Sequence, residues 1–590
     1  MADRYWVLGT GSWNTTSTLR WSATSGGPAG ASAPTSNDRV FFNGSSGGGT
    51  CTLTATVTCL SIDTTGYNGI IQFGTVNGLL CGSNAGVAST CVIASTTTLA
   101  GSGSSGYIQF GGNTGGNTLS FNPIISGSQL FQVRFNGSSI NTAWTITSWG
   151  TAFGFPGVNI TAVPGAFVHQ FCDLTLNANV FCVSYSANNG STVNRTRLNF
   201  NGFSIYLGRY GGTATNTILF SSLTTAGMRQ MVGNGGFIFD GTANTALKNI
   251  QWNSADEPPN FSVQPSSFVT TPITVVGTSY FRALTFTSNY GGTVTASTQC
   301  YAQTTTLSPN GTYTGARMGM SCNNNQAGDM TFTSNGRTVS IFDGNAQART
   351  TGTAVFRILD ALSSQDAVSF ISNTAVPCSV IFSNSLTTIN NGTGLTCNSS
   401  GTTTWTFSGS HAVNIRGTFT ISNGTQTVAT NPSVWNFTNA GSTVGFTLDN
   451  NTFNIGNVTY NGGGGQIQFS TAKTYPTFTL SVASLTMNTP TGVGGNPTIN
   501  IPNNVGISFG SLTLNTSSTN TTTFGGGGIG PKYITSPTSL NVTNCSFQGI
   551  RIVGGRWNAY NSNNNVDLGY NENVIFPNPN TSFGPFFNPP

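Results

Sequence analysis

One short pattern of apolar and polar residues returns at a fixed interval near the C-terminal end of the chain. The copies are residues 458–461 (Val-Thr-Tyr-Asn), 485–488 (Leu-Thr-Met-Asn) and 512–515 (Leu-Thr-Leu-Asn), with a looser copy at 540–543 (Leu-Asn-Val-Thr). Large apolar and polar residues alternate within each copy, as they do in a strand with one buried face. Successive copies are about 27 residues apart, and a fixed period of this size predicts a solenoid.

Stacking these copies predicts columns of like side chains. A second set of apolar alternations precedes the later copies, so we expect each coil to contain two strands joined by a short turn, then a longer return. Amide side chains one strand spacing apart can form a hydrogen-bonded ladder. The expected apolar column is Leu485, Leu512 and Leu540, and the expected amide column is Asn461, Asn488 and Asn515. The fold class predicted is all-β, a parallel β-helix with about 27 residues per coil in the C-terminal half.

The first 50 residues differ from the rest and predict a small Trp-rich N-terminal cap. Trp6, Trp13 and Trp21 lie at spacings of seven and eight residues among Gly, Ser and Thr. Three indoles in so short a stretch are typical of a small core. The alternative is that they stack on glycan rings, since aromatic faces suit that contact.

The rest of the chain divides into three regions. Residues 51–255 repeat the strand and turn pattern without one period and predict an irregular solenoid, whereas residues 256–575 predict a regular one. Prolines at 258 and 259 mark the boundary, because proline cannot donate a ladder hydrogen bond. One helix is expected at residues 354–367, with apolar Val355, Ile358, Leu359 and Leu362.

Residues 576–590 predict an extended C-terminal arm. The segment holds five prolines and four phenylalanines, which exclude a regular strand or helix and leave aromatic rings that are costly to expose. We expect this arm to dock on a neighbouring copy or another structural protein. The anchoring residues would be Phe576, Phe583, Phe586 and Phe587.

Composition supports the all-β class and excludes several partners. Charged residues make up only 6% of the chain, and three lysines and two glutamates leave few good formers of exposed helices. The 37% hydrophobic and 11% aromatic content is enough for an ordered fold. A net charge of +5 without a basic run predicts no nucleic-acid partner, and the lack of a long apolar stretch predicts no membrane partner.

The cysteine and histidine pattern predicts no metal and no cofactor. Eleven cysteines include no CxxC pair, and the two histidines have no neighbours at ligand spacing. We expect the cysteines to be small buried side chains. The alternative is a disulfide between Cys51 and Cys59 or between Cys172 and Cys182.

Both ends of the chain resemble known β-rich surface proteins. Residues 5–13 (Tyr-Trp-Val-Leu-Gly-Thr-Gly-Ser-Trp), continued at 21–22, 25–27 and 34–42, resemble the start of long bacterial surface proteins and of virion proteins of tailed, often marine, phages. Residues 554–557 and 563–576 resemble the final segment of the same phage proteins, with Val574 where the family has Trp. The resemblance covers roughly a tenth of the chain. It implies architecture and exposure, and it supplies no catalytic motif.

The leading hypothesis is a structural virion protein of a bacteriophage: a tail fibre, spike or capsid-surface fibre that is rigid and associates with itself or with other virion structural proteins. Binding to a host receptor, such as a surface glycan, stays open. The first residues lack the charged segment and apolar core of a secretory signal peptide, so we expect a protein made in the cytoplasm and displayed on the virion after lysis. A cleaved signal outside this numbering is the alternative. The second function class is then a bacterial cell-surface adhesin or filament subunit, outside the cell.

The third function class is a polysaccharide depolymerase, because parallel β-helices also carry glycan-cleaving enzymes. Such cleavage needs two nearby carboxylates. Asp343 and Asp366 come closest to one coil of separation in the sequence. Turn and cap roles explain both, so we expect no enzyme and no catalytic residue. Glycan binding without hydrolysis stays open through Trp144, Trp149, Trp405 or Trp435, although each is more typical of a core.

Overall fold

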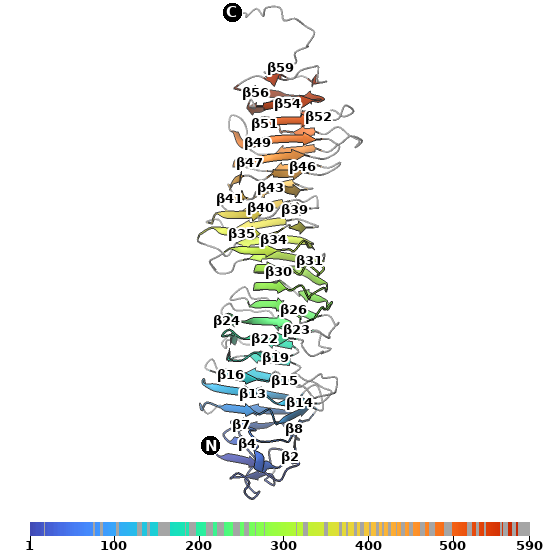
Figure 1. The fold of residues 1–590 in the computed structure, drawn as a ribbon. Coiled ribbons are helices and arrows are strands. Elements are labelled where there is room, and N and C mark those ends of the chain that lie inside the picture. Colours follow the sequence, from blue (N-terminus) through green and yellow to red (C-terminus); the bar gives the residue numbers. More distant parts are fainter. Residues whose placement is uncertain are drawn as a thin grey trace, which may run out of the picture. The chain divides into compact units, whose positions relative to one another are not determined.

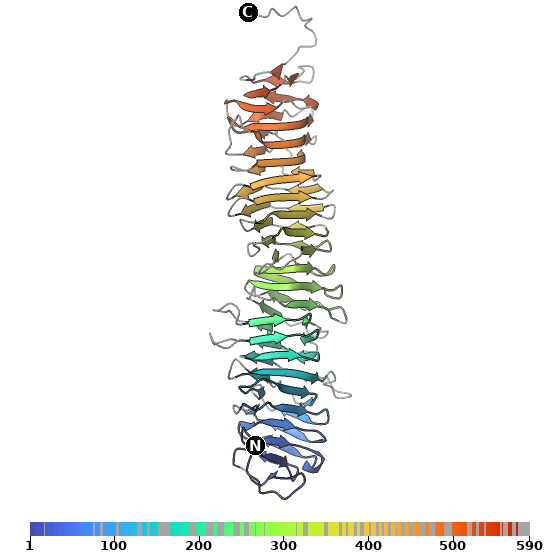
Figure 2. The same ribbon diagram turned by 90° about the vertical axis from the view of Figure 1, so that its left-hand side faces the viewer.

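The computed structural model is an all-β protein in which parallel strands stack into a β-solenoid. It describes residues 1–575 except residues 17, 75–76, 83–85, 102–105, 127–131, 138–141, 151–165, 171, 183, 188–195, 208–215, 221–228, 240–247, 253–258, 266, 276–277, 314, 322–328, 347–351, 361, 365–367, 373–375, 383–385, 390–394, 400–402, 409–411, 416–417, 423–425, 432–433, 438–442, 448–451, 461–465, 471–477, 489–497, 516–521, 527–529, 536–538, 555–556, 559–564, 569–570 and 572–573. The chain forms two compact units, Met1–Ala302 with Thr306–Thr312, and Gln303–Thr305 with Tyr313–Pro590. Within each unit the strands lie one above another across the stack (Figures 1 and 2).

The first unit begins with coils that visit three sheets in turn. Sheet A contains β1 (Asp3–Trp6), β3 (Trp21–Ser22), β4 (Arg39–Phe41), β7 (Ser61–Asp63), β10 (Thr90–Ile93), β13 (Asn117–Phe121), β16 (Ala143–Trp149), β18 (Asp173–Leu176), β21 (Thr196–Asn199) and β24 (Arg229–Val232). Sheet B contains β2 (Gly11–Trp13), β5 (Thr50–Leu53), β8 (Ile70–Phe73), β11 (Thr98–Gly101) and β14 (Ile124–Ser126). The third side, sheet C, includes β6 (Val57–Cys59), β9 (Gly78–Cys81), β12 (Tyr107–Phe110) and β15 (Gln132–Asn136).

The core of these coils follows from strand alternation. In β8, Ile71 and Phe73 are fully buried, and the residues between and before them are half-buried. The same pattern holds in β12, where Ile108 and Phe110 are buried. Each strand therefore sends every second side chain into the interior of the solenoid and leaves the others on its outer face.

The first coil is closed by a strand of opposite direction. Neighbours in sheet A are parallel from β24 to β1, but β3 pairs antiparallel with β1 through Tyr5 with Ser22 and Trp6 with Trp21. The predicted N-terminal cap thus corresponds to β1–β4, and β4 continues directly into the stack by pairing with β7. An antiparallel terminal strand covers the edge of β1 that would otherwise be open to another chain.

The second unit contains the predicted C-terminal repeat. Four strands pair in parallel, each with the next: β47 (Thr452–Tyr460), β49 (Phe478–Asn488), β51 (Gly506–Asn515) and β54 (Ser539–Thr543). Their register forms one column, in which Val458 lies opposite Leu485, Leu485 opposite Leu512, and Leu512 opposite Leu540. Asn488 pairs with Asn515, whereas Asn461 lies outside the described residues. The prediction of a parallel β-helix is confirmed, and the backbone register of its leucine column is the one expected.

The predicted division of each coil into two strands is wrong in two copies and correct in the third. The strand is continuous in β49 and in β51, with no turn, whereas β53 (Lys532–Thr535) and β54 are separate strands. Each continuous strand bends where the alternation of buried and outer residues is interrupted. In β49, Val482 and Leu485 are both buried although they are three residues apart. Gly510 occupies the bend in β51, where an added Cβ would lie 2.5 Å from the carbonyl oxygen of Ala483.

The expected helix at residues 354–367 is also wrong. The segment forms β35 (Ala354–Ile358) and β36 (Ser363–Ser364), and Ala354, Phe356 and Ile358 are buried at every second position. The parallel partner β38 (Cys378–Phe382) supplies ladder hydrogen bonds along this strand. Parallel neighbours on the stack therefore outweigh the helical spacing of the apolar residues.

The proline cluster does not interrupt the strand pairing. β25 (Gly236–Phe239) pairs in parallel with β27 (Asn260–Val263), so the stack continues past Pro259, and the two units divide near residues 302–313 instead. The described part of the chain has one helical element, the short η1 (Gly44–Ser46). Among those residues no helix is long and apolar enough to cross a membrane.

Candidate functional site

The three N-terminal tryptophans form the core of the cap. They come from β1, β2 and β3, and Trp21 lies with its ring centre 5.2 Å from that of Trp6 and 5.1 Å from that of Trp13. All three are 0% exposed, and Phe42 packs against each of them. The glycan-stacking alternative for these indoles is therefore wrong, because no ring face is open to a sugar.

The other candidate tryptophans give the same result where they are described. Trp144, Trp149 and Trp435 are buried, and the side chain of Trp405 lies outside the described residues. Trp144 donates its indole N–H to the carbonyl of Gly111 at 3.0 Å, which fixes the ring inside the solenoid. The three described indoles pack in the interior.

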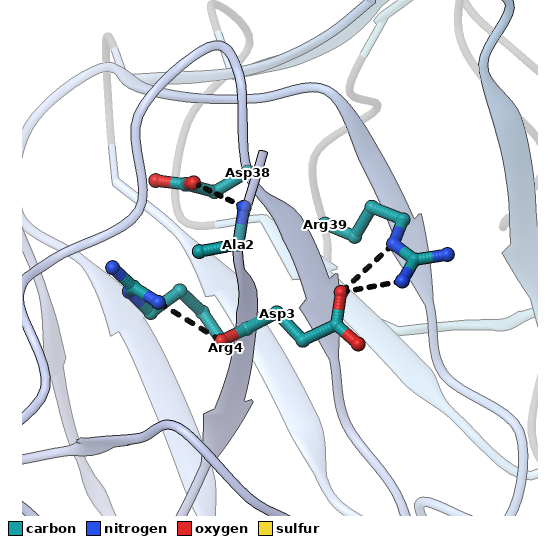
Figure 3. Close-up of polar contacts among 5 residues, drawn as sticks. All are labelled: Ala2, Asp3, Arg4, Asp38 and Arg39. Atoms are coloured by element: carbon teal, nitrogen blue, oxygen red, sulfur yellow. Dashed lines mark hydrogen bonds and ion pairs between the residues drawn. The ribbon is translucent and has the colours of Figure 1, made fainter.

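A polar network surrounds the start of β1 (Figure 3). The Asp38 carboxylate accepts hydrogen bonds from the amide of Ala2 at 3.0 Å and from the amide and hydroxyl of Thr35 at 3.0 and 2.8 Å. Asp3 forms an ion pair with Arg39 on β4, with both guanidinium contacts at 2.8 Å. The network ties the first strand to the segment that leads into β4.

Asp38 is the strongly held acid of this network. Burial alone would raise the pKa of this carboxyl group, but the hydrogen bonds from Thr35 and Ala2, together with the charge of Arg4, hold its pKa below the usual value. Asp38 is therefore ionised in the folded protein and stabilises the cap as an acceptor. It takes part in packing the cap and shows no feature of a catalytic acid.

The outer face of sheet A carries two columns of side chains that pass from the cap into the next coils. The parallel register places Arg39 beside Ser61, and Phe41 beside Asp63. Tyr5 stacks on Phe41 with ring centres 4.9 Å apart and planes inclined by 18°. The guanidinium carbon of Arg39 lies 5.8 Å from the centre of the Phe41 ring.

A hollow opens on this face, which we name the Ser61 hollow. Its volume is about 380 Å³. It is lined by Met1, Arg39, Phe41, Leu60, Ser61, Asp63, Val87, Ala88, Thr90 and Val92. An aromatic ring, a cation, an anion and two hydroxyl residues therefore border one cavity.

A second hollow, the Gly82 hollow, lies beyond the carboxyl ends of β9 and β12. Its volume is about 280 Å³, and its lining has no aromatic and no charged side chain. The lining residues are Ser36, Thr58, Leu80, Cys81, Gly82, Gln109, Gly111, Gly112, Asn136 and Gly137. This hollow offers neutral polar groups, backbone and the side chains of Leu80 and Cys81.

The structure describes only one of the two acids considered for glycan cleavage. Asp343 lies on β34 (Ile341–Ala346), and its carboxylate accepts a hydrogen bond from the Ser369 hydroxyl on β37 (Val368–Ser372). Burial raises the pKa of Asp343, while the Ser369 hydrogen bond and the charge of Arg317 act in the opposite direction. Asp366 lies outside the described residues, so the expectation that the two acids form no catalytic pair stays a prediction.

Other described acidic side chains form ion pairs or hydrogen bonds with neighbouring residues of the chain. Asp329 pairs with Arg357 at 2.6 Å, and Asp360 accepts hydrogen bonds from the amides of Ser334 and Asn335 at 2.6 and 2.5 Å. Asp63 accepts a hydrogen bond from the amide of Thr65 at 2.8 Å. These carboxylates stabilise turns and neighbouring coils.

The described cysteines are buried thiols. None of the ten is in a disulfide, so neither Cys51 with Cys59 nor Cys172 with Cys182 is bonded. The sulfur atoms of Cys59 and Cys81, which are opposite one another in β6 and β9, lie 3.6 Å apart. Within the described ranges no group of three His, Cys, Asp or Glu side chains is arranged to hold a metal ion.

Sequence reasoning did not identify the Ser61 hollow. In the sequence, only the alternation of residues 39–41 (Arg-Val-Phe) and 61–63 (Ser-Ile-Asp) points to it. This alternation predicts that the first and third residue of each segment lie on the same outer face. The predicted anchors Phe576, Phe583, Phe586 and Phe587 lie outside the described residues. No model of a known protein family matches the chain, and no curated protein or solved structure matches it either.

Proposed function

We propose that this chain is a structural protein of a bacteriophage particle, a fibre, spike or capsid-surface protein that exposes a β-solenoid and adheres to the host surface. The observation that carries the proposal is the in-register parallel stack with a fully buried apolar interior. Such a stack is stabilised by every neighbouring coil, and it leaves every second strand residue on an outer face that can meet a partner.

The low charge of the chain supports a displayed structural role. Only 6% of residues are charged, and the described ion pairs and carboxylate hydrogen bonds link neighbouring strands or turns. A glycan-cleaving enzyme needs an acid and a second carboxylate facing a substrate groove. The described partners of Asp329, Asp343 and Asp360 are instead groups of the fold itself. These contacts favour a structural role over the depolymerase.

We propose that the C-terminal arm, residues 576–590, mediates self-association or attachment to another virion protein. Its phenylalanines would be buried between chains, where aromatic anchors contribute most of the binding energy. Deleting residues 577–590 should leave the circular dichroism of the solenoid unchanged and weaken assembly measured by analytical ultracentrifugation. An unchanged oligomer or filament after the deletion would contradict this role.

The location of the protein tests the main proposal. Gold-labelled antibodies raised against the purified chain should bind phage particles in electron micrographs of lysates from the source culture. Labelling of intact bacterial cells instead would favour the adhesin or filament subunit. Labelling of neither, together with release of reducing sugar from host polysaccharide by the purified chain, would favour the depolymerase.

A further inference from the structure

We infer that the Ser61 hollow binds one neutral sugar ring of a surface glycan, an inference that rests on the adhesive function proposed above and names its ligand class. The hollow lies on the outer face of β4, β7 and β10, where it is reached from outside the solenoid. Its volume of about 380 Å³ falls in the usual range of small-molecule sites, about 300 to 1,000 Å³.

The hollow results from short side chains placed between longer ones. In the parallel register, Ser61 follows Arg39 on the outer face, and Asp63 follows Phe41 and precedes Val92. Tyr5 covers the face of Phe41 that is turned toward β1. The next residue in the column is the shorter Asp63, and both Phe41 and Asp63 line the hollow.

The lining matches the two kinds of surface that a sugar ring presents. Phe41 supplies an aromatic face for the C–H groups of the ring. Arg39 supplies guanidinium donors, the Asp63 carboxylate is an acceptor, and Ser61 and Thr90 supply hydroxyl groups for the ring hydroxyls.

The charges favour a neutral sugar over an acidic one. Arg39 is already paired with Asp3 at 2.8 Å, so its positive charge is largely balanced. The Asp63 carboxylate lies in the lining beside the Phe41 ring and repels a carboxylate or sulfate on a sugar. An acidic sugar is therefore the probe that should not bind.

The groups that would bind the sugar are held in place before it arrives. Asp3 fixes the Arg39 side chain, Tyr5 stacks on Phe41, and the amide of Thr65 holds one oxygen of Asp63 at 2.8 Å. Ordered side chains lose little rotamer freedom on binding, which lowers the cost of recognition.

Saturation-transfer difference NMR tests the inference with the full chain. The probes are the methyl glycosides of glucose, galactose and mannose, N-acetylglucosamine, and the acidic sugar N-acetylneuraminic acid. We expect transfer to at least one neutral sugar and none to the acidic one. Phe41→Ala should weaken binding about tenfold by removing the ring face. Ser61→Leu should abolish it by filling the hollow while the ring and ion pair remain.

Gln109→Ala in the Gly82 hollow is the matched control and should leave the signal unchanged. Circular dichroism checks that each variant is folded, and Ser61→Leu decides the matter if Phe41→Ala does not fold. No transfer to any neutral sugar, transfer only to the acidic sugar, or binding that survives Ser61→Leu would overturn the inference. Such a failure leaves the particle-labelling result unaffected, so the two proposals fail separately.

Discussion

Leu485 lies beside Leu512 in the parallel register of β49 and β51, and both side chains are fully buried. Replacing Leu512 with Asp would place an unpaired charge in this column. We expect Leu512→Asp to lower the free energy of unfolding of these coils by at least about 3 kcal/mol. Hydrogen exchange followed by mass spectrometry should show loss of protection in β49, β51 and β54.

The matched control is Thr513→Asp, one residue further along the same strand and half-buried on the outer face. It should change stability by less than about 1 kcal/mol, because the new charge stays in contact with water. Equal destabilisation by the two variants would show that Leu512 does not face the core.

Asp38 should make the cap sensitive to acid. The pKa of Asp38 is lower in the folded chain than its unfolded value of about 3.9. Its contribution to stability is therefore fully present above about pH 5 and is lost as pH falls through the folded pKa. Asp38→Asn should destabilise the cap by about 1.5 to 3 kcal/mol at neutral pH and by progressively less below about pH 4.

Thermal unfolding followed by tryptophan fluorescence across this pH range measures the difference between wild type and Asp38→Asn. Asp3→Asn is the control, because its ion pair with Arg39 is partly exposed, with side-chain exposures of 30% and 48%. Its effect should be less than about 1 kcal/mol. A difference between wild type and Asp38→Asn that grows as pH falls would contradict the assignment.

The cysteines should be unreactive until the chain unfolds. Burial raises the pKa of Cys300 to about 12, and burial also raises the pKa of Cys51 and Cys397. The thiolate is the reactive form, so Ellman's reagent at about pH 8 should label none of the ten described cysteines in the native protein. All eleven in the sequence should react in guanidinium chloride. Rapid native labelling of more than one thiol would contradict the packing, since Cys322 alone lies outside the described residues.

The regular coils were predictable because each repeats the same local pattern at one spacing. Val458, Leu485 and Leu512 each begin a short alternation that ends in a polar residue, so the register can be read without knowing the fold. The N-terminal coils are different. Along sheet A, Asp3 pairs with Arg39, Arg39 with Ser61, and Asp63 with Val92, and these three steps along the chain all differ in length. Unequal loops between short strands remove the period.

The wrong helix shows where local patterns mislead. Val355, Ile358, Leu359 and Leu362 have helical spacing, yet Leu359 is 42% exposed and the buried residues of β35 are Ala354, Phe356 and Ile358. Strand formation depends on neighbours in the next coil, such as Cys378 opposite Ala354, which lie far outside the window of a helical pattern. The Ser61 hollow has the same cause, because it brings together residues from three coils whose register the sequence alone does not reveal.

Every other inference depends on each strand pairing in parallel with the equivalent strand of the next coil. Engineered cysteine pairs test this register directly. Thr459 and Thr486 are opposite one another on β47 and β49, and Thr513 follows in the same column on β51. Neighbouring strands lie about 4.8 Å apart, within disulfide range, whereas strands two coils apart lie at about 9.6 Å, which is beyond it. After mild oxidation with diamide and chymotryptic mass spectrometry, Thr459→Cys with Thr486→Cys should yield the disulfide and Thr459→Cys with Thr513→Cys should not. A disulfide in the second pair, or in neither, would contradict the register.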